Sequence, residues 1–128
     1  MYQAEIPYGA YWSTPFARWQ GSFSHLHSLQ FAGYVVKNEL AARAIDSTIF
    51  DAGVLGVSVP QKRSFYGLPW VAGMAGIGHI GGPTLMQACA TGVRVLFTAV
   101  QEIESGLADA VLAITCDRTS NGPHIYYP

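Results

Sequence analysis

The sequence predicts an α/β fold in which helices cover a layered, mostly parallel β-sheet. Apolar runs of strand length alternate with segments of helical periodicity, in the order strand, helix, strand, helix, strand, helix, strand. The run at residues 52–59 is apolar on consecutive positions, which is typical of a strand buried on both faces. The chain has 128 residues, the size of one ordinary domain.

The first elements are expected to be a strand and a long helix. Ala4–Tyr8 has the length of a short strand, and an aromatic-rich loop follows over residues 9–21. Ser24 is placed to cap a helix that ends near Ala44. The apolar residues of this helix recur at helical spacing: Leu29, Ala32, Val36 and Leu40.

The middle of the chain continues the alternation. The strand over 52–59 is stopped by a proline, and Pro69 opens a short helix that continues to residue 75. Gly76, Gly78 and Gly81 then match the string G-x-G-x-x-G. A dinucleotide-binding fingerprint needs a strand before this string and a helix directly after it, whereas a proline and a strand-like run follow here. We therefore interpret the string as a connector.

The last elements are a strand, the clearest helix of the chain and a final strand. Thr84–Ala88 is the first of these, and Asp109–Cys116 is expected to be a buried strand. One face of the helix between them carries larger apolar residues: Val93, Leu96, Phe97, Val100 and Ile103. Because Val95 and Ala99 widen this apolar arc, we expect the helix to pack on more than one side.

The composition predicts that a partner covers part of the surface. Charged residues make up 12% of the chain and hydrophobic residues 50%, whereas a typical soluble domain is about 25% charged. We infer that more polypeptide or a partner subunit covers the remaining apolar surface. The net charge of −1 gives no electrostatic argument for a nucleic acid or an anionic membrane as a partner.

Other patterns bear on location. Residues 1–5 lack a basic region followed by an apolar core, so we expect no signal peptide. The least polar stretch, residues 68–80, is shorter than the ~18 apolar residues that span a bilayer. Two cysteines at positions 89 and 116 make no disulfide framework and fit no metal motif. We expect a reducing, cytoplasmic environment.

Cys89 is the candidate nucleophile. It stands between a predicted strand and a predicted helix, and the N-terminus of a helix favours the negative charge of a thiolate, the reactive form. Ala90, Thr91 and Gly92 after it are small, so an acyl group could approach the sulfur. The alternative is a buried cysteine that acts as a small hydrophobic residue.

The other titratable candidates have no context that selects them. Cys116 ends an apolar strand with no helix after it, and we interpret it as part of the core. The histidines stand in segments without a recognisable motif: His25, His27, His79 and His124.

The chain resembles the N-terminal portion of the thiolase family, the acetyl-CoA acetyltransferases. Four motifs occur in the family's order. The first motif is Thr-Pro-Phe-Ala-Arg at 14–18 with Gly-Ser at 21–22, and it is similar to the family's Thr-Pro-Phe-Gly-Arg and Gly-Ser. The second is Cys-Ala-Thr-Gly at 89–92, which stands where the family has Cys-Gly-Ser-Gly. Residues 103–111 resemble Ile-x-x-Gly-x-x-Asp-Val, and Ser-Asn-Gly-Pro at 120–123 resembles Ser-Asn-Ala-Pro.

The resemblance implies a thiolase-like layered α/β fold, of which residues 1–116 are the N-terminal half-domain and residues 117–128 a tail toward an absent loop that binds coenzyme A (CoA). It implies that Cys89 accepts an acyl group and that a carbon–carbon bond in a (3-keto)acyl-CoA is made or cleaved. CoA thioesters are then the substrates, with no covalently bound cofactor. The implied partners are acyl-CoA, further copies in a dimer or tetramer, and the missing C-terminal half or another subunit.

The resemblance also leaves alternatives open. The family's Gly-His-Pro and Cys-x-Gly-Gly-Gly motifs do not occur in these residues, so no histidine here and not Cys116 takes their roles. A non-catalytic thiolase-like scaffold or truncated subunit is one alternative. A ketoacyl synthase is the other, because Ala-Cys-Ala at 88–90 is also similar to that family, although Ser-Asn-x-Pro favours thiolase.

Overall fold

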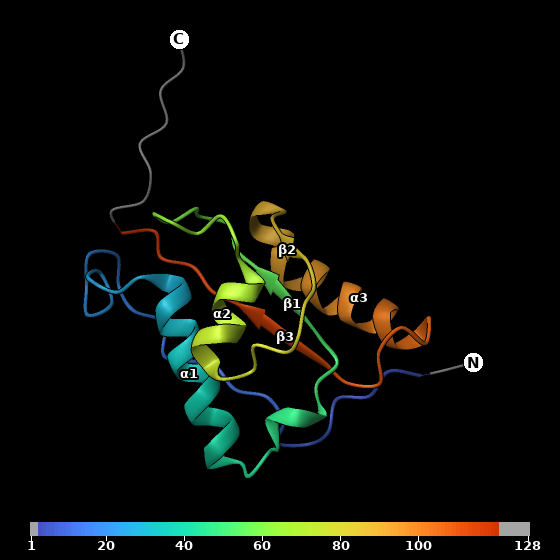
Figure 1. Ribbon diagram of the computed structural model, residues 1–128. Coiled ribbons are helices and arrows are strands. Elements are labelled where there is room, and N and C mark those ends of the chain that lie inside the picture. The colour runs from blue at the N-terminus through green and yellow to red at the C-terminus, as the bar shows by residue number, and fades with distance from the viewer. Residues whose placement is uncertain (1–2, 121–128) are drawn as a thin grey trace.

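The computed structural model describes residues 3–120 and places a parallel sheet between helices (Figure 1). In these residues the strands are β1 (Ala52–Gly56), β2 (Thr84–Leu85) and β3 (Val111–Thr115), in the order β2-β1-β3. The helices are α1 (Ser28–Ala42), α2 (Leu68–Ala75) and α3 (Thr91–Glu104), with short 3-10 turns η1 (Ser47–Ile49) and η2 (Ala88–Ala90). The expected α/β class with a parallel sheet is confirmed.

The register brings the carboxyl ends of the three strands to one edge of the sheet. β1 is central, and Leu55 lies opposite Thr84 of β2 and Ile114 of β3. The segments that follow the strands therefore emerge side by side, and one of them leads directly into η2 and α3 (Figure 1). In open α/β sheets this edge is where ligands usually bind.

The sheet has a core on each face. The larger core joins the sheet to α1 and α2 and includes Leu29, Leu55, Leu68, Val71 and Ile114. The smaller core joins the sheet to α3 through Val54, Val95 and Ala99. Burial of these side chains contributes about 1.5–3 kcal/mol for each large aliphatic residue, and it fixes α3 against β1.

The packing of α3 separates its apolar residues into two groups. Val95 and Ala99 lie in the core, whereas Val93, Leu96 and Phe97 are exposed, Val93 by 74%. The small residues that widen the apolar arc are thus the ones that contact the sheet. In residues 3–120 the larger apolar face of α3 has no comparable cover.

The first expected strand is absent. Residues 3–7 form neither helix nor strand, and Ile6 and Tyr8 are 67% and 97% exposed. Pro7 lacks the N–H group that an internal ladder position requires. The segment is held instead at Gly9, whose carbonyl accepts a hydrogen bond from Arg43 Nε at 2.9 Å.

The expected start of the first helix was also wrong. Ser24 lies in a turn, and the N-cap of α1 is His27, whose Nδ1 accepts a hydrogen bond from the backbone N–H of Leu29. The helix ends at Ala42, close to the expected position. Ala44 has a φ of 52°, a left-handed conformation that stops the helix.

The strands are shorter than the apolar runs that predict them. β1 ends at Gly56 rather than at residue 59, β2 ends at Leu85 rather than at Ala88, and β3 covers 111–115 within the expected 109–116. β3 is buried on one face only, since Leu112 and Ile114 are buried and Ala113 is exposed. The glycine string at 76–81 follows α2 and opens no helix, which confirms its interpretation as a connector.

The Asp51 carboxylate is expected to make the fold less stable in acid. Its Oδ2 accepts hydrogen bonds from the backbone N–H groups of Asp109 and Ala110 at 2.8 and 3.0 Å, which lower the pKa of Asp51. Because the pKa of Asp51 is lower in the folded state, its carboxylate stabilises the fold at pH values above the unfolded pKa of about 3.9. This stabilisation is lost as the pH falls through the folded pKa. Asp51→Ala should therefore flatten the fall of the melting temperature below about pH 4, as measured by circular dichroism. An unchanged acid slope would contradict this.

Candidate active site

Cys89 lies in η2, the 3-10 turn immediately before α3, and its side chain is exposed. The expected strand-to-helix transition is present, although β2 ends four positions earlier than the cysteine. Within residues 3–120 Cys89 is thus not buried, unlike the packing cysteine of the alternative. The thiol stands at the carboxyl edge of the sheet, in front of the N-terminus of a helix of 14 residues.

The turn before Cys89 has an unusual backbone and several hydrogen bonds. Ala88 has a φ of 48°, a left-handed conformation that costs a non-glycine residue about 1–3 kcal/mol. Thr91, which is buried, accepts a hydrogen bond at Oγ1 from the N–H of Gln87 at 2.8 Å and donates one to the carbonyl of Ala88 at 2.7 Å. These bonds stabilise the conformation that ends β2 and turns the chain toward solvent at Cys89.

The loop after β1 supports the same turn. Ser58 donates a hydrogen bond from Oγ to the carbonyl of Ala88 at 3.0 Å. Asp117, directly after β3 and Cys116, accepts hydrogen bonds at Oδ1 from the N–H groups of Ser58 and Val59 at 2.7 and 2.8 Å. Sequence reasoning missed Ser58 and Asp117. Ser58 lies near the end of the predicted strand 52–59 and Asp117 directly follows the predicted strand 109–116, so the shared edge of parallel strands is the signal that could have found them.

Gly56 determines how closely α3 approaches the sheet. A Cβ atom at this position would lie 2.6 Å from Val95 Cγ2 and 2.7 Å from Thr91 Cγ2, closer than carbon atoms pack. Only a glycine therefore allows the first turns of α3, and with them Cys89, to lie where they do.

Cys116 differs from Cys89 in its burial. It is partly buried and packs against the larger core, as expected. Burial and, to a smaller extent, the nearby Asp117 carboxylate raise the pKa of the Cys116 thiol to about 12, against a smaller opposing effect of the hydrogen bond with Ser28. A thiol with such a pKa is almost entirely protonated near neutral pH and is a poor nucleophile.

No histidine in residues 3–120 is hydrogen-bonded to Cys89. His27 caps α1, and its Nε2 lies 2.7 Å from the carbonyl oxygen of Lys62. His79 Nε2 lies 3.1 Å from the carbonyl oxygen of Phe50, which precedes β1 and so belongs to the opposite edge of the sheet. His25 is exposed, and His124 lies outside the described residues.

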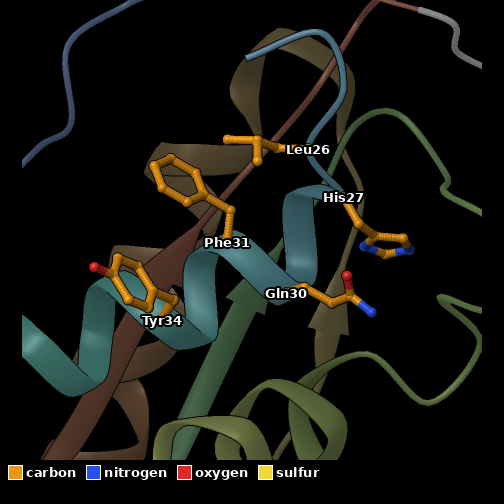
Figure 2. Close-up of a pocket in the computed structure, with 5 residues that line it drawn as sticks. All are labelled: Leu26, His27, Gln30, Phe31 and Tyr34. Atoms are coloured by element: carbon orange, nitrogen blue, oxygen red, sulfur yellow. The ribbon is translucent and has the colours of Figure 1, made fainter. Parts of the chain in front are cut away.

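A shallow depression lies on the N-terminal part of α1 and the segment before it (Figure 2). Leu26, His27, Gln30, Phe31 and Tyr34 line it, and the lining is almost entirely apolar. α1 covers the opposite face of the sheet from α3 (Figure 1). The depression is therefore separate from Cys89, and its histidine is occupied in the helix cap.

Between residues 3 and 120, no three His, Cys, Asp or Glu side chains are grouped so that they could hold a metal ion. None of the helices in this range has the length and hydrophobicity that a membrane-spanning helix requires.

The sequence matches a known family over nearly its whole length. Residues 10–127 match the family described as "Thiolase, N-terminal domain". The chain belongs to the thiolase family. Of the motifs that carry the resemblance, the Ser-Asn-x-Pro motif is described only at Ser120, whose Oγ accepts a hydrogen bond from the N–H of Gln20 at 2.6 Å; its other residues lie outside the described range.

Curated relatives and solved structures agree with this thiolase assignment. The chain is 30% identical to an acetyl-CoA acetyltransferase of Saccharomyces pastorianus and 29% identical to that of Saccharomyces cerevisiae, over 90% of its own length. Its structure is similar to the Bacillus anthracis acetyl-CoA acetyltransferase (TM-score 0.77, 18% identity, 87% of this chain and 28% of that chain). It is also similar to human mitochondrial 3-ketoacyl-CoA thiolase in complex with CoA (TM-score 0.71, 22% identity, 78% and 26%).

These similarities confirm that the chain has a thiolase-like fold and corresponds to the N-terminal portion of a thiolase. The chain spans 29% of the length of the two yeast relatives. At these identities the structural neighbours support the fold alone, so the chemistry at Cys89 is taken up below as a proposal.

Proposed function

We propose that this thiolase-family chain carries the acyl-accepting cysteine of an acyltransferase that acts on CoA thioesters. The observation that carries the proposal is the exposed Cys89 at the N-terminus of α3, in a chain whose residues 10–127 match the thiolase N-terminal domain. Relatives named acetyl-CoA acetyltransferase, and a structural neighbour solved in complex with CoA, support an acyl-CoA substrate.

In the proposed reaction the Cys89 sulfur attacks the carbonyl carbon of an acyl-CoA. The new S–C bond forms as the bond from that carbon to the CoA sulfur breaks, and the thiol proton leaves with CoA. A second acyl-CoA then loses a proton from its α-carbon, and this carbon attacks the carbonyl of the acyl-cysteine. The carbon–carbon bond forms as the S–C bond to Cys89 breaks, and the proton taken from the α-carbon returns to the Cys89 sulfur; the reverse sequence cleaves a 3-ketoacyl-CoA. Dividing the reaction in this way replaces one difficult step with two easier ones. The backbone N–H of Cys89 is suited to bind the oxyanion.

We assign the base that activates Cys89 to polypeptide outside residues 3–120, because no histidine in this range is hydrogen-bonded to the cysteine and burial raises the pKa of Cys116 to about 12. The exposed apolar face of α3, formed by Val93, Leu96 and Phe97, is the surface we assign to the polypeptide that supplies it. The yeast relatives are more than three times as long as the aligned region, so the family offers such a polypeptide. A dimer or tetramer, located in the cytoplasm, completes the proposal.

Acyl trapping tests the proposal. The intact protein is incubated with acetyl-CoA, quenched in acid and digested, and the peptides are examined by mass spectrometry. We expect an acetyl group on Cys89 and none on Cys116. An acetyl carrier-protein thioester serves as the alternative donor, since transfer from that donor alone would favour a ketoacyl synthase. Absence of an adduct from either donor would favour the non-catalytic scaffold.

Alkylation provides a test that needs no substrate. Iodoacetamide at pH 7–8 should modify Cys89 at least roughly tenfold faster than Cys116, because Cys89 is exposed and the buried Cys116 thiol has a pKa of about 12. The two rates are measured in the same sample by peptide mass spectrometry, so each cysteine controls for the other. Equal rates in the folded, assembled protein would contradict a reactive Cys89.

A further inference from the structure

We propose that Asp117 and Ser58 are positioning residues that set the orientation of the Cys89 backbone. This inference deepens the proposed function and rests on it. Asp117 fixes the loop after β1, and Ser58 of that loop fixes the peptide group that joins Ala88 to Cys89. The ends of the central strand β1 and of its neighbour β3 thus act on Cys89 through one peptide unit.

The first step is the contact between Asp117 and the loop. A single oxygen, Asp117 Oδ1, accepts hydrogen bonds from two successive N–H groups, those of Ser58 at 2.7 Å and Val59 at 2.8 Å. Hydrogen bonds to an ionised carboxylate are stronger than those between neutral groups, by about twofold. Since Asp117 follows β3 and Ser58 follows β1, the carboxylate fixes the loop relative to the paired strands.

The second step is the contact between the loop and the turn. The carbonyl of Ala88 accepts two hydroxyl donors, Ser58 Oγ at 3.0 Å and Thr91 Oγ1 at 2.7 Å. The two hydroxyl oxygens lie 3.4 Å apart, so the donors approach the carbonyl together. Ser58 is the only one of the two that comes from another strand end, and it ties the turn to the sheet.

The third step follows from the planarity of the peptide bond. The Ala88 carbonyl and the Cys89 N–H belong to one peptide unit, and no cis bond occurs in the described residues. In a trans peptide the C=O and N–H point in opposite directions within one plane, so two hydrogen bonds that fix the carbonyl also fix the N–H. This N–H is the proposed oxyanion donor, and the Cα that bears the Cys89 side chain is bonded to the same nitrogen.

The proposal predicts a defect in chemistry rather than in substrate binding. Ser58→Ala in the intact protein should slow single-turnover acetylation of Cys89 by acetyl-CoA roughly tenfold, because small displacements of reacting groups have large effects on rate. The acetyl-CoA concentration that gives half the maximal rate should stay unchanged. Ser58→Thr retains the hydroxyl and should restore the rate. Asp117→Ala should slow acetylation as Ser58→Ala does, whereas Asp117→Asn keeps an acceptor oxygen and should lose less.

Matched controls separate positioning from stability. Ser105→Ala removes a serine that donates to the carbonyl of Glu102 at the other end of α3. Asp51→Ala removes a carboxylate that also accepts from two successive N–H groups, at the opposite edge of the sheet. Both controls should acetylate Cys89 at the wild-type rate. Melting temperatures measured by circular dichroism show whether each variant is folded.

The outcomes are distinct. If Ser58→Ala is folded and reacts at the wild-type rate, the positioning role is overturned. It is also overturned if Ser105→Ala and Asp51→Ala slow the reaction equally, or if Ser58→Thr fails to restore it. Should Ser58→Ala not fold, the acetylation rates of Asp117→Asn and Asp117→Ala are compared instead. The positioning role is overturned if folded Asp117→Ala reacts at the wild-type rate or if Asp117→Asn loses as much rate as Asp117→Ala. A wild-type protein that does not acetylate at all would instead contradict the proposed function itself.

Discussion

Replacing Cys89 with alanine is expected to lower the acyl-transfer rate of the intact protein by roughly a thousandfold or more, the loss typical when a covalent nucleophile is removed. The variant keeps every hydrogen bond of the turn, because these involve the backbone of Gln87 and Ala88 and the side chains of Ser58 and Thr91. Its stability should therefore be close to that of the wild type. Acyl transfer is measured by release of free CoA from acetyl-CoA with a thiol-reactive dye.

Cys116→Ala is the matched control for this prediction. It removes the other cysteine, which packs against the larger core, so we expect a small loss of stability with activity retained. Wild-type activity in Cys89→Ala would show that Cys89 is not the nucleophile. An equal loss of activity in Cys116→Ala, in folded protein, would show that the two thiols do not differ as their burial and the raised pKa of Cys116 require.

Replacing Gly56 with alanine is expected to destabilise the protein by about 1–3 kcal/mol, in the range of overpacked cores. The new Cβ would lie 2.6 Å from Val95 Cγ2 and 2.7 Å from Thr91 Cγ2, so α3 must move away from β1. Because Thr91 holds the turn before Cys89, the displacement should also slow acetylation of Cys89. Urea unfolding measures the first effect and single-turnover acetylation the second.

Gly73→Ala is the control for this substitution. Gly73 lies within α2, and a Cβ there would meet no atom within 4 Å. Alanine should stabilise the protein by about 0.5–1 kcal/mol, because it lowers the backbone entropy of the unfolded chain and favours the helix. A Gly56→Ala variant as stable as Gly73→Ala would mean that α3 does not pack on Gly56 as closely as described.

The sequence by itself determined the types and alternation of the elements from the first helix onward, and the position of Cys89. Helical spacing located α1 and α3, and continuous apolar runs located β1 and β3, because these patterns depend only on residues close in the chain. The same local information placed Cys89 between a strand and a helix. The thiolase resemblance, carried by short motifs, was likewise readable from the sequence and is confirmed by the family match.

Predictions from local sequence patterns were wrong where the structure of a segment depended on residues distant in the chain. Ala4–Tyr8 has the length of a strand but lies outside the sheet, and Ser24 is a good capping residue but His27 caps α1. His27 is also joined to the carbonyl of Lys62, which is 35 positions away. A strand requires a neighbour, and a cap requires the chain to turn in the right place, so neither is specified by the segment alone.

Only the tertiary structure decided which groups surround Cys89. The register of β1 with β3 brings Asp117 to Ser58 across 59 positions of sequence, and the loop after β1 brings Ser58 to Ala88 across 30. The packing of α3 decided that Val95 and Ala99 face the sheet and that Val93, Leu96 and Phe97 stay exposed. The physical reason is that a hydrogen bond or a packed contact depends on the distance between two groups in space, and strand pairing sets that distance independently of local propensity.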